Sequence, residues 1–186
     1  MPRASVETRE HVLRVAHDLF YWHGIRATGV DRVAEAAGVA PTTLYRLFAD
    51  KDELIAAYVE RADRETRAWF TAAVRAAGPD PRARILAVFD TLNERVGPDR
   101  CRGCTFLMAL AEFPDDRLPA HRRAVAAKSW VRARMGELTA QLGVADPEAL
   151  ADQLVLVMEG VHASAQGSRG PADQARALAE AILPPA

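Results

Sequence analysis

The chain has 186 residues, of which 49% are hydrophobic and 26% charged, and its formal net charge is -1. This composition is typical of a globular protein long enough for one ordinary domain, or for a small domain joined to a larger one. The charge neither favours nor excludes a nucleic-acid partner, and the lack of any run of about 18 uncharged apolar residues excludes a membrane-spanning helix.

The start of the chain and its cysteine content indicate the compartment. Met1 to Glu7 contain no apolar stretch of the kind found in signal peptides, so we expect a cytoplasmic protein. The two cysteines, Cys101 and Cys104, are too few for the disulfide scaffold of a secreted domain.

Helical spacing of apolar residues dominates the whole chain and predicts an all-α fold. The first amphipathic segment ends at Gly24, a second runs from Val30 to Ala37, and a third from Pro41 to Phe48. A long fourth helix is expected from Asp50 to about Ala76, because Asp50 and the residue three positions later, Glu53, form a capping box. One face of the first segment is formed by Val12, Leu13, Ala16, Leu19 and Phe20.

Proline and glycine breaks divide the rest of the chain into about five more helices, and so about nine in total. Asp80-Pro81 and Asp146-Pro147 each place a capping aspartate before a proline at the first helical position, where the missing N–H costs nothing. The predicted helices are 81–96, 102–113, 119–142, 147–167 and 171–183.

The second and third helices match the internal spacing of a helix-turn-helix. If Val30 is position one, then Ala34 is position five, where a small side chain lets the two helices cross closely. Gly38 is position nine, in a turn whose left-handed backbone favours glycine. Leu44 is position fifteen, the apolar plug of the small core.

The third helix is the expected recognition helix, which enters the major groove of DNA. Leu44 and Phe48 are four residues apart and should face inward, which leaves the other polar side chains available to DNA. Threonine and tyrosine hydroxyls contact phosphates, and an arginine reads guanine or contacts the backbone. These candidates are Thr42, Thr43, Tyr45 and Arg46, with Lys51 placing its ammonium beside a phosphate at the start of the next helix.

At these residues the chain closely resembles the TetR (tetracycline-repressor-like) family of regulators, over about residues 8–57. The matching positions are Thr28, Val33-Ala34, Ala37-Gly38-Val39, Leu44-Tyr45, Phe48 and Lys51. The resemblance implies a three-helix DNA-binding domain over residues 5–65, with the helix-turn-helix proper at 29–48. The DNA-binding residues it implies are Thr28, Pro41, Thr42, Thr43, Tyr45, Arg46 and Lys51.

Two positions depart from the family pattern. Gly29 and Ala40 stand where the family often has a capping Ser or Thr, a cap worth about 1 kcal/mol. Thr28 could cap the second helix instead, and Pro41 could offset part of the loss at the third. Neither departure removes a DNA-contacting type of residue, so we still expect operator binding.

The segment from Gly103 to Pro114 looks like the start of the regulatory domain in one branch of the family, which implies a larger helical domain over residues 66–186. Such a domain encloses a small-molecule pocket and carries the dimer interface. The pocket candidates are Phe89, Asn93, Phe106, Met108, Trp130, Glu159 and His162. The dimer candidates are Leu150, Leu154, Val157, Met158, Val161, Ala165, Ala175, Leu178 and Ile182. For both sets, packing in the core of a single chain is the alternative.

Cys101 and Cys104 have the spacing of a metal-binding or redox-active thiol pair, to which His121 could add a third ligand. No fourth ligand is evident, and Cys104 matches a family position where a buried, inert thiol is expected. We therefore expect no metal and no cofactor. A thiol- or metal-sensing repressor is kept as the alternative function.

The function expected from the sequence is a repressor that binds a palindromic operator in double-stranded DNA as a homodimer and is released by a small molecule. Binding to operators would associate it with the bacterial nucleoid. An enzyme is not expected, because the chain lacks a glycine-rich phosphate loop and the common hydrolase motifs. A protein-binding helical module with a vestigial helix-turn-helix is the third hypothesis.

Overall fold

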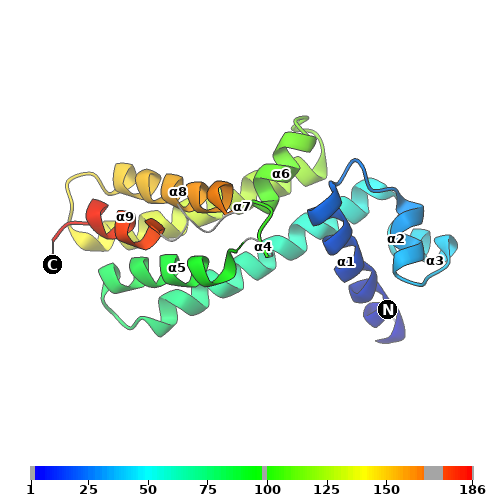
Figure 1. Ribbon diagram of the computed structural model, residues 1–186, viewed down its shortest axis with the longest axis horizontal. Helices are drawn as coiled ribbons and strands as arrows, with labels where there is room; N and C mark the ends of the chain where they lie inside the picture. Colours follow the sequence, from blue (N-terminus) through cyan, green and yellow to red (C-terminus); the bar gives the residue numbers. More distant parts are fainter. Residues whose placement is uncertain (1–2, 98–99, 166–173, 186) are drawn as a thin grey trace. The chain divides into compact units, whose positions relative to one another are not determined.

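The computed structural model describes residues 3–97, 100–165 and 174–185 (Figure 1). Over these residues the chain forms nine α-helices, one short 3₁₀ turn and no strand, which confirms the all-α prediction. The helices are α1 (Arg3–His23), α2 (Val30–Ala36), α3 (Pro41–Leu47), α4 (Lys51–Ala76), α5 (Pro81–Arg95), α6 (Thr105–Glu112), α7 (Pro119–Thr139), α8 (Pro147–Ser164) and α9 (Ala175–Ile182).

The predicted helix boundaries hold closely, with two instructive differences. The predicted helix 102–113 begins only at Thr105, because Gly103 has φ +145, a backbone angle outside the helical region. The predicted helix 119–142 ends at Thr139 and continues as a 3₁₀ turn. The expected start of the last helix at residue 171 and the expected end of the preceding one at residue 167 lie outside the described residues.

The predicted caps form in the structure. Asp80 accepts hydrogen bonds from the N–H groups of Arg82 and Ala83, and Asp146 accepts one from Ala149. At α4, Asp50 accepts from the N–H of Glu53 at 2.8 Å, whereas Glu53 reaches one residue beyond the cap to the N–H of Ala49 at 2.7 Å. These side chains satisfy helix N–H groups that have no partner within the helix.

The chain forms two compact units, and residues 105–125 are the notable difference from the predicted division at residue 65. The first unit combines Met1–Asp63 with Thr105–Val125, and the second combines Arg64–Cys104 with Ala126–Ala186. The segment 105–125 therefore belongs to the same compact unit as the helix-turn-helix, although it follows residue 104 of the second unit in the chain. Long-range contacts of this kind are invisible to local sequence patterns.

In the first unit, α1, α2 and α3 pack against one another and the first half of α4 (Figure 1). Apolar side chains from all four helices are removed from solvent here. The largest fully buried side chains of this unit are Leu13, Phe20, Ile25, Leu44, Phe48, Leu54, Ile55 and Tyr58. Each buried side chain of this size contributes about 1.5–3 kcal/mol to folding.

In the second unit, α9 packs along both α5 and α8 (Figure 1). Its core contains apolar residues from α5, α7, α8 and α9, including Phe89, Leu92, Met135 and Leu154. None of the helices in the described part of the chain is long and apolar enough to cross a membrane.

Candidate nucleic-acid interface

The turn between α2 and α3 depends on Gly38. This residue has φ +64, and its N–H donates to the carbonyl of Glu35 while the N–H of Val39 donates to that of Ala34, both at 3.0 Å. The two bonds form the Schellman motif that ends many helices. A Cβ at Gly38 would meet no atom within 4 Å, so the position favours glycine because of its backbone angle and not for lack of space.

The core beneath the turn has the predicted plug. Leu44 and Phe48 are fully buried, as their four-residue spacing predicts. Ala34 is also buried, with only 1% of its surface exposed, as expected where two helices cross closely. This packing fixes the direction in which the remaining side chains of α3 point.

The opposite side of α3 is open to solvent. Pro41, Thr42, Tyr45 and Arg46 are exposed, and Thr43 is half-buried. Because residues three and four apart on a helix are neighbours, Thr42, Tyr45 and Arg46 share one face. Tyr45 leaves 49% of its surface exposed, so this large aromatic side chain does not belong to the core. This face has the hydroxyls and the guanidinium that DNA contacts require.

The caps at Gly29 and Ala40 are missing, as the sequence predicts: neither α2 nor α3 has a side-chain cap hydrogen bond. Thr28 does not replace the first of them. Its hydroxyl donates to the carbonyl of Gly24 at 2.8 Å, and the residue is fully buried. The predicted DNA contact by Thr28 is therefore corrected: a buried hydroxyl cannot reach a phosphate, and Thr28 instead holds the turn before α2.

Lys51 is half-buried at the first position of α4. Its Nζ donates to the carbonyl oxygen of Arg26 at 3.3 Å, which holds the ammonium beside the helix-turn-helix. An ammonium has three donors, so this bond does not exhaust its capacity for a phosphate.

Sequence reasoning missed a contact between α6 and the turn that follows α1. The carboxylate of Glu112 accepts hydrogen bonds from the N–H groups of Ile25 and Arg26, at 3.0 and 2.6 Å. No local pattern links residues 86 positions apart. The only signal in the sequence was that Glu112 matches a position of the family segment, and that match did not indicate what the side chain does.

The predicted pocket residues do not all lie in one unit. Phe106 and Met108 belong to the first unit, whereas the other five belong to the second. Phe89 is fully buried among apolar neighbours, which is the packing alternative given for this set. Asn93, Trp130, Glu159 and His162 are only partly buried.

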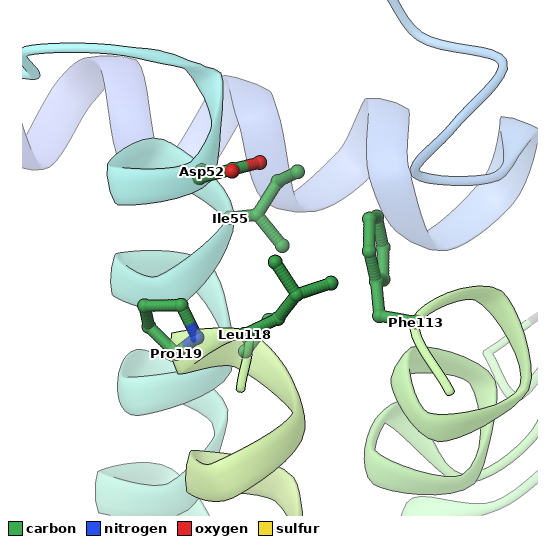
Figure 2. A pocket seen from close by; sticks show the side chains of 6 residues that line it. Asp52, Ile55, Phe113, Leu118 and Pro119 are labelled. Atoms are coloured by element: carbon green, nitrogen blue, oxygen red, sulfur yellow. The ribbon is translucent and has the colours of Figure 1, made fainter. Parts of the chain in front are cut away.

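A small hollow lies in the first unit between α4 and the segment joining α6 to α7. Its lining includes Ile55, Phe113 and Leu118, whose side chains point toward one another in Figure 2. Its cavity volume is about 10 Å³, far below the 300–1,000 Å³ of typical ligand sites. This hollow is therefore too small for a drug-sized effector.

A polar cluster in the second unit joins α7 and α8. Lys128 forms an ion pair with Glu159, and the Nδ1 of His162 lies 3.0 Å from the carbonyl oxygen of Met158, one turn earlier. Burial lowers the pKa of His162 below its usual value of 6.5, and the nearby Lys128 ammonium acts in the same direction. The ring is therefore neutral in the folded protein at neutral pH. Lys128 is a member of this cluster that the sequence did not single out.

This pKa predicts an acid-sensitive fold. Below pH 6.5 the unfolded chain binds a proton at His162 that the folded chain excludes, so the free energy of unfolding falls, by at most about 1.4 kcal/mol per pH unit, until the pH reaches the lowered pKa. Above pH 6.5 neither state binds that proton. His162→Gln should flatten this acid limb in denaturant titrations at pH 5 to 7. The exposed His23→Gln is the control, and equal limbs in both variants would contradict the assignment.

Most of the predicted dimer residues lie in the core of the single chain. Leu150, Leu154, Met158, Val161, Ala165 and Ala175 are buried there. Val157 and Ile182 are partly buried against the same core, and only Leu178 is exposed, at 51%. Both apolar stripes are therefore buried mainly within the single chain, which is the alternative given for them. A partner would have to bind the other faces of α8 and α9.

The two cysteines are not joined by a disulfide. Cys101 is buried, with its Sγ 3.9 Å from the carbonyl oxygen of Gly103, and Cys104 is half-buried. His121, the suggested third ligand, places its Nδ1 2.8 Å from the carbonyl oxygen of Phe113. Across the described residues, no three metal-ligating side chains are grouped together.

Comparison with known proteins extends the match beyond the helix-turn-helix. The family model for bacterial regulatory proteins of the tetR family matches residues 12–58. The transcriptional regulator YjdC of Escherichia coli K12 is 31% identical over 177 residues, which cover 94% of this chain and 93% of YjdC. A TetR-family regulator from Streptomyces coelicolor is 35% identical, with a TM-score of 0.89 over 95% of this chain and 94% of its own.

A TetR regulator from Chloroflexus aurantiacus has the same fold at lower similarity, with 24% identity and a TM-score of 0.83 over 96% of this chain and 95% of its own. The relatives are transcriptional regulators and not enzymes, as the sequence predicts for this chain.

Proposed function

Because the chain belongs to the tetR family of DNA-binding transcriptional regulators, we propose that it is a repressor that binds a palindromic operator as a homodimer and is released by a small molecule. The observation that carries this proposal is the exposed face of α3, which presents Thr42, Tyr45 and Arg46 to solvent. Operator binding requires access to the chromosome, so the proposed place of action is the cytoplasm, at the nucleoid.

The outward faces of α8 and α9 support a homodimer. On α8 the exposed positions follow a helical stripe of mostly small or apolar residues, and Leu156 leaves 67% of its surface exposed. The uncharged exposed residues are Ala149, Gln153, Leu156, Gly160 and Ala163 on α8, and Ala177, Leu178 and Ala181 on α9. The charged exposed residues of these helices, Glu148, Asp152 and Glu180, form ion pairs with Arg132 and Arg82 of the same chain. A partner that covers this stripe would remove its apolar area from water.

Gly160 adds an independent argument for a partner helix. A glycine in a helix interior costs about 1 kcal/mol relative to alanine. A Cβ at Gly160 would meet no atom within 4 Å, so nothing in the described part of its own chain requires the glycine. Close approach of a second helix provides a reason. The proposed partner is a second copy of the chain. In a dimer with a twofold axis, the same helix face of both copies forms the interface, so Gly160 of each copy would lie against the partner helix.

A dimer explains how two recognition helices read one site. Two copies of α3 placed about 34–36 Å apart would meet successive major grooves on one side of the DNA, which requires a palindromic operator. A ligand that binds better to a differently spaced dimer would shift the population away from DNA. The partly buried polar groups of the second unit, Glu159, His162 and Lys128, are the proposed polar contacts of that ligand.

The test is selection of bound DNA from fragments of the source genome, followed by footprinting of the recovered sites. Recovery of one palindromic site with half-sites about 10 base pairs apart, centre to centre, supports the proposal. Its position upstream of a gene, and a fall in that gene's transcription when the protein is supplied, would establish repression. Recovery of random fragments, or of none, would contradict operator binding.

Lys51 should contribute a phosphate contact. Lys51→Ala is expected to weaken binding to the selected operator and to flatten the plot of log affinity against log salt by about one unit per bound copy, because one fewer counterion is released. Arg122→Ala, which removes one exposed positive charge from α7, is the control. A slope that stays the same in Lys51→Ala would show that this ammonium contacts no phosphate.

A further inference from the structure

The turn from α1 to α2 sets where the helix-turn-helix begins. Gly24 ends α1 with φ +91, and its N–H donates to the carbonyl of Phe20 at 3.0 Å. Beyond it, Ile25 is fully buried, and the buried Thr28 hydroxyl bonds back to the carbonyl of Gly24. Two main-chain N–H groups of this turn, at Ile25 and Arg26, have their partner outside the three helices of the DNA-binding motif.

That partner is Glu112, the last residue of α6. One carboxylate oxygen accepts from the N–H of Ile25 at 3.0 Å, and the other accepts from the N–H of Arg26 at 2.6 Å. Hydrogen bonds to an ionised carboxylate are stronger than those between neutral groups. Because both oxygens are used on adjacent residues, the pair fixes the orientation of the turn as well as its distance from α6.

Arg26 makes the link reciprocal. Its Nε donates to the carbonyl oxygen of Glu112 at 2.6 Å, and its guanidinium lies 5.1 Å from the centre of the Phe113 ring. On its other side, the carbonyl oxygen of Arg26 accepts from the Nζ of Lys51 at 3.3 Å. A continuous series of polar contacts therefore runs from Glu112 through Arg26 to the ammonium proposed to meet a phosphate.

The location of Glu112 in the chain gives this link its significance. The segment 105–125 packs in the first unit, but it follows Cys104 of the second unit directly and leads into the part of α7 that belongs to the second unit. Exposed N–H groups such as that of Arg26 could be satisfied by water, so hydrogen-bond satisfaction alone does not require an acidic side chain there. An acidic side chain there can, in addition, hold the turn before α2 at a fixed position relative to α6.

We propose that Glu112 is a positioning residue for operator binding: it holds the turn before α2, and through Arg26 it holds Lys51, in the arrangement that fits DNA. This inference rests on the proposed operator binding and deepens it. Any displacement of α6 relative to the turn breaks both carboxylate bonds together.

The test compares three variants of the full-length protein. Glu112→Gln keeps the shape of the side chain but leaves one amide without an acceptor, and Glu112→Asp keeps the charge but shortens the reach by one methylene. Asp116→Asn, in the loop after α6, removes the same charge at an exposed position and serves as the control. Affinity is measured on the selected operator well below the melting temperature, and the amide resonances of Ile25 and Arg26 are followed in ¹⁵N-labelled protein.

We expect Glu112→Gln and Glu112→Asp each to weaken operator binding on the order of tenfold, which is a typical size for coupling between sites, and to shift both amide resonances. Asp116→Asn should match the wild type in both measurements. The amide shifts report the contact itself, which a general loss of stability would not move selectively.

Three results would overturn the inference. Unshifted amides in Glu112→Gln would show that the contact is absent, and shifted amides with wild-type affinity would show that it positions nothing relevant to DNA. Wild-type affinity in Glu112→Asp, with weak binding in Glu112→Gln alone, would attribute the effect to charge and also overturn it. If the wild type selects no DNA, the proposed function is contradicted instead. The two failures can be told apart because the amide measurement tests the Glu112 contact without any DNA.

Discussion

Leu156→Glu is expected to convert the protein to a monomer and to weaken operator binding at least about 100-fold. Leu156 is the most exposed of the large apolar side chains in the described residues, at 67%, so its own chain loses little when it is replaced. A glutamate there would place a charge, and its copy by symmetry, at the proposed twofold interface. Two linked half-site contacts gain a factor of about 10² to 10⁴ over one, and dissociation removes that gain.

The measurement is molecular mass by light scattering, with operator affinity on the same samples. Gly160→Arg is a second variant with the same expected outcome, because its Cβ meets open space in the single chain. Val125→Glu places the same charge on an exposed apolar position of α7 and should leave the mass of a dimer unchanged. A dimer that survives both Leu156→Glu and Gly160→Arg would remove this face as the interface.

Leu44→Ala is expected to lower the free energy of unfolding by about 2–5 kcal/mol, the range for leucine truncation in a closed core. Leu44 is fully buried beneath the turn of the helix-turn-helix, so its truncation would leave a cavity in the core. A loss of this size is a large fraction of the stability of an ordinary domain, about 5–15 kcal/mol, so operator binding should weaken through partial unfolding of the first unit.

The neighbouring residue provides the matched control. Tyr45→Ala changes the next side chain along α3, which is 49% exposed, so its effect on stability should stay within about 0.5 kcal/mol. Its operator affinity should fall about fivefold per half-site, as expected for the loss of one hydrogen bond of about 1 kcal/mol. Denaturant titration and DNA binding separate the two effects. Equal destabilisation by both substitutions would show that Tyr45 belongs to the core.

The DNA-binding motif could be predicted because its determinants are local. Gly38 needs its positive φ, Leu44 and Phe48 follow helical spacing, and the exposed residues of α3 are those left over when these are buried. Thr28 shows where this reasoning stops. Its identity fitted both a DNA contact and a structural hydroxyl, and only its full burial beside Gly24 decided between them.

The interface predicted for α8 and α9 shows a second limit. An apolar stripe indicates which face of a helix is buried, but not whether its own chain or a partner buries it. Here the stripes that contain Leu154 and Ala175 are buried in the core of a single chain. The outward face of α8 contains the exposed Leu156 and Gly160 instead. Gly160 can be read directly from the sequence, but its role in a helix interface can be inferred only once the structure shows that the space around it is open.

The sequence by itself determined the helices, the turn at Gly38 and the exposed face of the recognition helix, because each depends on residues a few positions apart. Only the tertiary structure placed residues 105–125 with the DNA-binding motif and joined Glu112 to Ile25 and Arg26, 86 or more residues away. The physical reason is range: helical periodicity and backbone angles act along the chain, whereas a carboxylate finds its donors across space, wherever packing has brought them.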